Sequence, residues 1–517
     1  MDDSHYTHIH ELTIPAYHAA LLNGTTTCEQ TVSAYLAQIA RYNPTLRAII
    51  TINENALDDA RQKDIELVRF LQDNTNTNTS STPNEPTPKE KKRLLPLHGV
   101  PLLLKDTYAT SHLPTTCGVL ALSTLQTHPY NAPIVQSLLA SGAILLAKTN
   151  LHEFSLEGTT TSSLGGQTLN PYDLTRTPGG SSGGTAAALA ANMGLAGCGG
   201  DTMNSLRSPA SACAVVGFRP TTGRVCTRGV VGVSKTQDAL GPMGRSVGDV
   251  RVMWGVMGGS LLEMESPSPT VAAVTTSSIT NDATATTIDT PTNNPKPNPT
   301  DKEENTPLRI GLLTTYFPSP TDPETHAINN IMQTALHRIQ STSPSKNQTQ
   351  NPPTPRPIHI IPLPTQQTTP WDAARLRSEA DTQSFEFKQE LDSFLQSPFI
   401  SHTPHTSLAS IAASGAYHKT AVTAAFHETL QADKFNTQCA AYKTRLQRIS
   451  ELKASVQTCF DNERLDALVY PHQKRLVVPV GETVQSGRNG ILAALTGRPA
   501  VCIPGIYLSH YSSCFFS

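Results

Sequence analysis

Residues 177–201 read TPGGSSGGTAAALAANMGLAGCGGD, and this stretch decides how the rest of the chain is interpreted. Two glycines stand on each side of Ser181 and Ser182, and an alanine-rich stretch follows them. Glycines permit a tight turn, and the alanines favour a helix after it. The backbone N–H groups at the start of such a helix are free to bind an anion or a substrate oxygen.

On its own sequence, this turn is open to three interpretations. It could bind phosphate, but it lacks the Gly-Lys-Ser/Thr ending of a P-loop and no strand clearly precedes it. It could be a structural turn that does no more than begin a helix. It could also be an active-site turn that presents hydroxyl groups, and the surrounding segments favour this third interpretation.

Outward from the turn, short apolar runs alternate with helical patterns. Residues 100–104 form an apolar run that ends at Lys105, which predicts a buried strand. Residues 143–147 predict a second strand, and Asn131 with Pro133 predicts the start of the helix between the two. Alternation of this kind predicts an α/β fold.

Lys105 and Ser205 support the active-site interpretation of the turn. Lys105 precedes Ser181 by 76 positions, and Ser205 follows it by 24. A lysine at the end of a strand usually lies at the surface. A lysine buried beside hydroxyl groups instead loses its proton readily, because burial disfavours the charged form, and it can then act as a base.

Together these segments resemble the amidase signature family of Ser-Ser-Lys amidohydrolases. The family's order and spacing are matched by GVPLLLKD at 99–106, PGGSSGG at 178–184 and DTMNSLR at 201–207. GRNG at 487–490 and TGRPA at 496–500 extend the resemblance, which runs over residues 10–505 outside three polar inserts. The resemblance implies a large mixed β-sheet core covered by helices on both faces.

The resemblance also implies a role for each site residue. Ser205 is similar to the nucleophile, Ser181 to the bridging serine that follows a cis peptide bond, and Lys105 to the neutral general base. Backbone N–H groups would form the oxyanion hole, and two further side chains would support the loops. The oxyanion residues are Thr202, Met203, Asn204 and Ser205, and the supporting residues are Ser182 and Arg207.

These roles predict an amidase that cleaves the C–N bond of a linear carboxamide through an acyl-enzyme on Ser205. The resemblance requires no metal or organic cofactor, and the expected partner is a small-molecule amide. The sequence does not determine whether the protein forms a homodimer. One alternative is a component similar to the A subunit of glutamyl-tRNA amidotransferase, which needs partner subunits. The other is a non-catalytic pseudoenzyme.

Composition excludes several other classes of protein. The 517 residues contain 39 Lys and Arg against 41 Asp and Glu, so the net charge of -2 provides no basic surface for nucleic acid. Nine scattered cysteines without a Cys-x-x-Cys pair favour a reducing compartment. No stretch reads as a secretory signal or a membrane span, so we expect a cytoplasmic protein with no membrane partner.

Three polar segments predict disordered inserts in one amidase domain over residues 1–517. They lie at 74–92, 265–307 and 341–357, where too few apolar side chains are present to offset the entropy cost of ordering. Their Asn, Thr and Pro runs are typical of fungal proteins. After residue 505 the sequence departs from the family pattern, which predicts a truncated C-terminal end.

A second departure affects the nucleophile loop. The family usually has Gly-Gly before the nucleophile, whereas this chain has Met203 and Asn204. If the loop required positive φ, Met would fit poorly, and the oxyanion hole would be impaired. His98 and His152 invite a serine–histidine mechanism, but Ser205 lacks a Gly-x-Ser-x-Gly elbow, and we interpret both histidines as structural.

Overall fold

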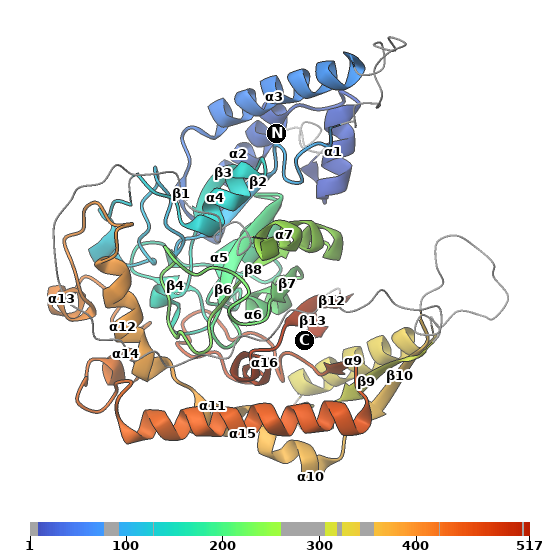
Figure 1. Ribbon diagram of the computed structural model, residues 1–517, viewed down its shortest axis with the longest axis vertical. Coiled ribbons are helices and arrows are strands. Elements are labelled where there is room, and N and C mark those ends of the chain that lie inside the picture. The colour runs from blue at the N-terminus through green and yellow to red at the C-terminus, as the bar shows by residue number, and fades with distance from the viewer. Residues whose placement is uncertain are drawn as a thin grey trace, which may run out of the picture.

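The central feature of the protein is an eight-stranded mixed sheet with the order β1-β3-β2-β6-β8-β7-β12-β13. The computed structural model describes residues 9–76, 92–127, 129–259, 306–317, 323–341, 356–422, 424–508 and 511–516. The strands are β1 (Ile49–Ile52), β2 (Pro101–Lys105), β3 (Ile144–Thr149), β6 (Ala196–Asp201), β7 (Val216–Arg219), β8 (Ala239–Gly244), β12 (Ala500–Leu508) and β13 (Tyr511–Phe516). Helices cover the sheet, which confirms the predicted α/β fold (Figure 1).

Strand β2 positions the site, because it runs parallel to both of its neighbours, β3 and β6. All of its residues are buried, as is typical of parallel strands whose two faces are covered. The carboxyl ends of parallel strands lie at the same edge of a sheet. Lys105 at the end of β2 and Asp201 at the end of β6 therefore share one edge.

Smaller sheets and a set of helices surround this core. β9 (Leu308–Leu312) lies between β10 (Ile358–Pro362) and β11 (Ala467–Val469) in a parallel sheet, and β4 (Thr161–Ser162) pairs with β5 (Gly166–Gln167). The helices are α1 (Ile14–Leu22), α2 (Cys28–Leu46), α3 (Ala56–Asn76), α4 (Pro133–Ala140), α5 (Gly183–Ala190), α6 (Arg207–Ala212), α7 (Val247–Gly259), α9 (Pro323–Ser341), α10 (Thr365–Thr368), α11 (Ala373–Ala380), α12 (Gln383–Leu395), α13 (Leu408–Ser414), α14 (Ala424–Thr429), α15 (Ala440–Glu463) and α16 (Ile491–Thr496).

Two apolar clusters hold these elements together. The larger surrounds the central sheet and contains buried residues from Ile9 to Cys502. The second lies where the long helix α15 packs on α11 and α16, at the opposite end of the molecule from α3 (Figure 1). Met203 is the member of the second cluster that comes from the loop between β6 and α6, which carries Ser205. The chain after residue 306 therefore packs directly on that loop.

Several sequence predictions need correction at their boundaries. Helix α3 continues to Asn76 and α9 to Ser341, so the inserts predicted at 74–92 and 341–357 begin with helical residues. Residues 77–91 and 342–355 of these inserts and residues 265–305 of the third lie outside the described residues. The prediction that Asn131 caps a helix is wrong. Its side-chain oxygen accepts the N–H of Ser111 at 2.8 Å, and Ala132 is the N-cap of α4.

Within the described ranges, no helix combines the length and the apolar character needed to cross a bilayer.

Candidate active site

Lys105 lies in direct contact with the glycine-serine turn. Its ammonium nitrogen Nζ donates a hydrogen bond to the Ser181 Oγ at 2.7 Å. Both side chains are buried, with Lys105 only 2% exposed and Ser181 not exposed. Burial is the main cause that lowers the pKa of Lys105 to about 8, and the negative charges of Asp201 and Asp238 oppose it only in part. Roughly one lysine in ten is therefore neutral at pH 7, far more than for a lysine in water.

The turn between residues 179 and 184 fixes the backbone of Ser181. The Gly180–Ser181 peptide bond is cis, as the resemblance implies, and Gly179 adopts φ +69°. The Ser181 carbonyl accepts the backbone N–H of His152 at 3.0 Å. Helix α5 begins immediately after the turn at Gly183, so the predicted order of turn and helix is confirmed.

Ser205 lies on the loop that joins β6 to α6, next to this turn. Its carbonyl accepts the backbone N–H of Ser182 at 3.2 Å, which joins the two serine-bearing segments. The residue is 7% exposed. Among the described residues, no partner hydrogen-bonds the Ser205 hydroxyl, so its proton is not committed to another acceptor.

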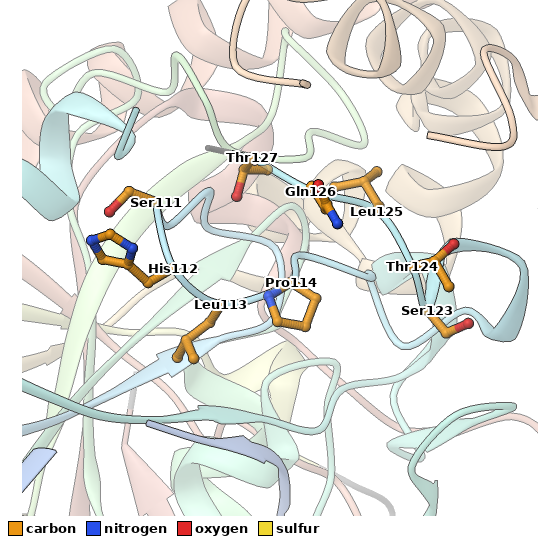
Figure 2. Close-up of a pocket in the computed structure, with 9 residues that line it drawn as sticks. All are labelled: Ser111, His112, Leu113, Pro114, Ser123, Thr124, Leu125, Gln126 and Thr127. Carbon is orange, nitrogen blue, oxygen red and sulfur yellow. The ribbon is translucent and has the colours of Figure 1, made fainter. Parts of the chain in front are cut away.

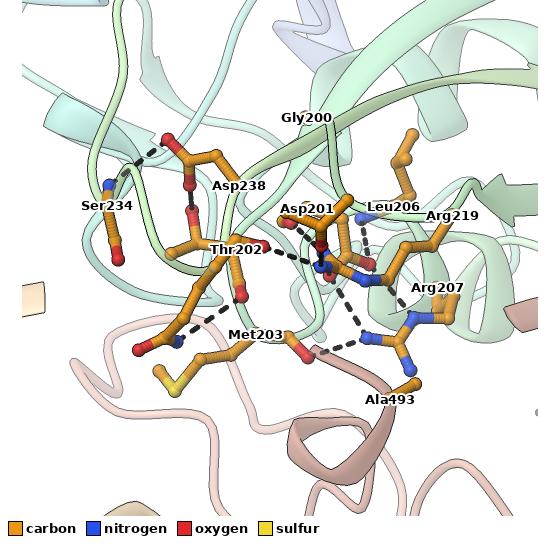
Figure 3. A network of polar contacts seen from close by, with 12 residues as sticks. Gly200, Asp201, Thr202, Met203, Leu206, Arg207, Arg219, Ser234, Asp238 and Ala493 are labelled. Carbon is orange, nitrogen blue, oxygen red and sulfur yellow. Dashed lines mark hydrogen bonds and ion pairs between the residues drawn. The ribbon is translucent and has the colours of Figure 1, made fainter. Parts of the chain in front are cut away.

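An ion-pair network holds the Ser205 loop (Figure 3). The Arg207 guanidinium donates to the Asp201 carboxylate through Nε and Nη2, both at 3.0 Å, and Arg219 Nη1 donates to the same carboxylate at 3.1 Å. All three side chains are fully buried. Burial by itself raises the pKa of Asp201, but the two guanidinium groups outweigh it and hold that pKa below its usual value. The carboxylate therefore stays charged.

The same network reaches the backbone of the loop. Arg207 Nη2 donates to the Met203 carbonyl at 2.7 Å, and Thr202 Oγ1 donates to Asp238 Oδ1 at 2.6 Å. Both contacts are drawn in Figure 3. These contacts fix the loop through a carbonyl and a side chain. They do not use the backbone N–H groups of the loop. In the described part of the chain, none of the backbone N–H groups of residues 202–205 donates a hydrogen bond.

The two residues that depart from the family pattern fit this loop. Neither Met203 nor Asn204 adopts positive φ, so the loop does not need glycine for its backbone conformation. The Met203 side chain is 6% exposed and packs in the second apolar cluster. The steric objection raised by the sequence at these two positions is therefore absent.

The remaining candidates have structural contacts. Ser182 Oγ donates to the Gly200 carbonyl at 3.2 Å, which ties the turn to the end of β6. His152 contacts Thr159 and the carbonyl of Ala421 through its two ring nitrogens, and burial lowers its pKa to about 4. Its imidazole is therefore neutral, and both ring nitrogens already have hydrogen-bond partners. His98 is also buried and lies beside α1, where its carbonyl faces His18.

Two features of the site were missed by sequence reasoning. Arg219, 18 positions after Asp201, completes the ion-pair network, and Asp238 anchors Thr202. Arg219 lies in GFRPT at 217–221, and no local sequence pattern around it or around Asp238 indicates these contacts. Among the described residues, no group of His, Cys, Asp and Glu side chains is arranged to hold a metal ion.

A surface cavity of about 570 Å³ lies apart from the serines (Figure 2). It is lined by the loop segments 111–114 and 123–127 and contains none of the candidate catalytic, oxyanion or supporting residues. The lining is mixed, with hydroxyl groups, an amide and apolar side chains (Figure 2). It is distinct from the Lys105–Ser181 contact.

The mixed sheet carries a buried lysine–serine contact at its edge, which makes this an α/β protein with a candidate serine–lysine site. A family model described as Amidase matches residues 66–504. The chain therefore belongs to the amidase family, and the resemblance to amidase signature enzymes is confirmed.

The proteins similar to this chain include an amidotransferase subunit and a peptide amidase. The chain is 37% identical over 254 residues to the A subunit of glutamyl-tRNA(Gln) amidotransferase from Chloroflexus aurantiacus, a match that covers 49% of this chain and 48% of that protein. The chain thus spans about half the length of the curated relatives it matches. The peptide amidase of Stenotrophomonas maltophilia shares its fold with a TM-score of 0.71 and 25% identity, covering 98% of this chain and 92% of the other. The A subunit of the glutamyl-tRNA(Gln) amidotransferase from Thermotoga maritima has the same fold, with a TM-score of 0.62, 19% identity, and coverage of 98% and 90%.

Proposed function

We propose that the protein hydrolyses the C–N bond of a linear carboxamide through an acyl-enzyme on Ser205. The observation that carries the proposal is the 2.7 Å contact between Lys105 Nζ and Ser181 Oγ, made by a buried lysine whose pKa is lowered. A serine hydroxyl is a weak nucleophile until a base accepts its proton. Lys105 is the proposed base. Ser181 contacts it directly, and the next residue, Ser182, donates its backbone N–H to the Ser205 carbonyl at 3.2 Å.

In the proposed first step, Ser205 Oγ attacks the substrate carbonyl carbon. Its proton passes to Ser181, and the Ser181 proton passes to neutral Lys105. When the tetrahedral intermediate collapses, the proton returns by the same route to the leaving nitrogen, and the C–N bond breaks. The ester on Ser205 is then hydrolysed by water, which the same relay deprotonates. A small-molecule amide is the substrate class.

Backbone N–H groups of Thr202, Met203, Asn204 and Ser205 are the proposed donors to the carbonyl oxygen. They make no other hydrogen bond to a described residue, so none has to be broken when the oxyanion forms. One such donor is worth about 3–4 kcal/mol of transition-state stabilisation. The ion pairs of Asp201 hold the loop without using these groups, which supports the assignment.

A second candidate is a role similar to that of the amidotransferase relatives. The 37% identity to the A subunit of glutamyl-tRNA(Gln) amidotransferase favours it. In that case the protein would release ammonia from an amide within a complex. Purification from its own cells separates the two candidates, because an amidotransferase component would copurify with stoichiometric partner subunits. An amidase would purify without them and hydrolyse amides.

Labelling with a fluorophosphonate probe tests the proposal and the pseudoenzyme alternative together. Wild-type protein should be labelled on Ser205, and Ser205→Ala should abolish both labelling and hydrolysis in a panel of small amides. Ser208→Ala is the matched control, because Ser208 Oγ is a buried hydroxyl close by that has no hydrogen-bond partner among the described residues. Absence of labelling in the wild type, or labelling that persists in Ser205→Ala, would refute the proposal.

A further inference from the structure

Thr160 packs against the glycine-serine turn and has an unusual backbone conformation. It precedes strand β4, it is fully buried, and it adopts φ +55°. Positive φ in a residue branched at Cβ is a genuine outlier, because the side chain crowds the backbone. Such conformations persist where surrounding contacts determine them, and they concentrate at functional sites.

The Thr160 hydroxyl bridges the two flanks of Ser181. Its Oγ1 donates to the Gly179 carbonyl at 2.6 Å and accepts the backbone N–H of Gly183 at 3.1 Å. One contact lies two residues before Ser181 and the other lies two residues after it. A single hydroxyl therefore closes the turn that contains the cis peptide bond and presents Ser181 to Lys105.

Two glycines of the turn make room for this hydroxyl. A Cβ atom at Gly180 would lie 2.7 Å from Thr160 Oγ1, and one at Gly183 would lie closer still. Neither glycine has positive φ, so their conformation does not explain the absence of a side chain. The space taken by Thr160 explains it together with that of Gly158, beside Gly180, and Pro178, beside Gly183.

The neighbouring residues hold Thr160 in its conformation. Its carbonyl accepts the backbone N–H of Thr168 at 3.0 Å and the Gln167 amide at 3.3 Å. Both partners come from the strand or loop that follows β4, so the Thr160 backbone is fixed independently of the turn. The hydroxyl is therefore held by a rigid support and can impose a position on the turn.

We propose that the Thr160 hydroxyl is a positioning group that sets the distance between Ser181 Oγ and Lys105 Nζ. The inference rests on the proposed function of Ser181 as a proton relay. Thr160 makes no hydrogen bond to Lys105 or Ser205 among the described residues, so it acts through the turn. A displacement of about 1 Å at a reacting group can cost roughly 100-fold in rate.

Kinetics of hydroxyl-deletion variants test the proposal. Thr160→Val keeps the shape of the side chain and removes the hydroxyl, Thr160→Ala removes it with less crowding, and Thr160→Ser retains it. We expect kcat to fall about 10- to 100-fold in the first two, with KM within about twofold, and to recover to within about threefold in Thr160→Ser. Thr429→Val is the matched control, because the buried Thr429 hydroxyl contacts the carbonyls of Ser384 and Ala425 rather than the turn.

Equal losses in Thr160→Ser and Thr160→Ala, or a wild-type kcat in the hydroxyl-deletion variants, would overturn the proposal. A crystal structure of Thr160→Val or Thr160→Ala gives a readout that does not depend on activity. The Lys105 Nζ to Ser181 Oγ distance should exceed 3.5 Å there, against 2.7 Å here. An unchanged distance would refute positioning by Thr160. If the wild type cleaved no amide while the distance changed as expected, only the proposed function would fail.

Discussion

The two serine-bearing segments of the site are held by different kinds of force. Neutral hydrogen bonds and close steric fit hold the Ser181 turn, with Thr160 and His152 as partners of its backbone. Buried charges and an apolar anchor hold the Ser205 loop, through Asp201 and Met203. The turn keeps the family sequence, whereas the loop departs from it just before Ser205.

This difference indicates what each segment tolerates. In the turn, a side chain at Gly180 would collide with the Thr160 hydroxyl, so the sequence is restricted by space. In the loop, the backbone is set by ion pairs at its two ends and needs no positive φ. Residues inside the loop can therefore change, provided that the charges remain and the new side chains find a place in the second apolar cluster.

The largest loss of turnover is expected at Lys105, because its proposed role is proton transfer rather than packing. Lys105→Met keeps the length of the side chain and removes the amine, so kcat should fall by roughly 10²- to 10⁴-fold. The melting temperature should stay near the wild-type value, since an apolar side chain replaces an amine that is already fully buried. Steady-state kinetics and a thermal scan check both. Near-wild-type turnover would show that another group is the base.

Asp201→Asn should produce the largest loss of stability in the loop. The substitution leaves the guanidinium groups of Arg207 and Arg219 buried without a counter-charge, which costs about 3–5 kcal/mol of unfolding free energy. Asp173→Asn is the control, because Asp173 pairs with Arg176 at the surface and is 38% exposed. Urea unfolding of both variants measures the difference. Equal losses would show that burial does not distinguish the two ion pairs.

The contrast also separates what the sequence predicted from what it did not. The strand ending at Lys105, the turn and the helix after it follow local rules of composition and periodicity, and these predictions are confirmed. The contacts of Arg219 and Thr160 join segments 18 or more residues apart, which no local pattern encodes. Asn131 shows the limit of local rules. Its side chain was expected to cap α4, but it instead accepts a hydrogen bond from the backbone N–H of Ser111, 20 residues earlier.

A smaller loss is expected when the apolar anchor of the loop is removed. Met203→Ala should lower the unfolding free energy by about 2–3 kcal/mol, because it leaves a cavity in the second apolar cluster. Met203→Leu conserves volume and should cost less than about 1.5 kcal/mol. Urea unfolding of both variants provides the measurement. If both variants matched the wild type, the packing of Met203 would not stabilise the loop.

The last prediction concerns the pH dependence of the wild-type protein, which needs no substitution and tests the Ser181 turn separately from the Ser205 loop. The lowered pKa of Lys105, about 8, means that the lysine is mostly protonated below pH 8 and neutral above it. The proposed relay needs the neutral form, so kcat/KM should rise about tenfold per pH unit up to that value and then level off. The Asp201 carboxylate should not contribute, because its pKa is held below the usual range. His152, with a pKa of about 4, is neutral throughout. Initial rates between pH 6 and 10 test this, and a profile that is flat, or that bends near the ordinary pKa of histidine, would remove Lys105 from the relay.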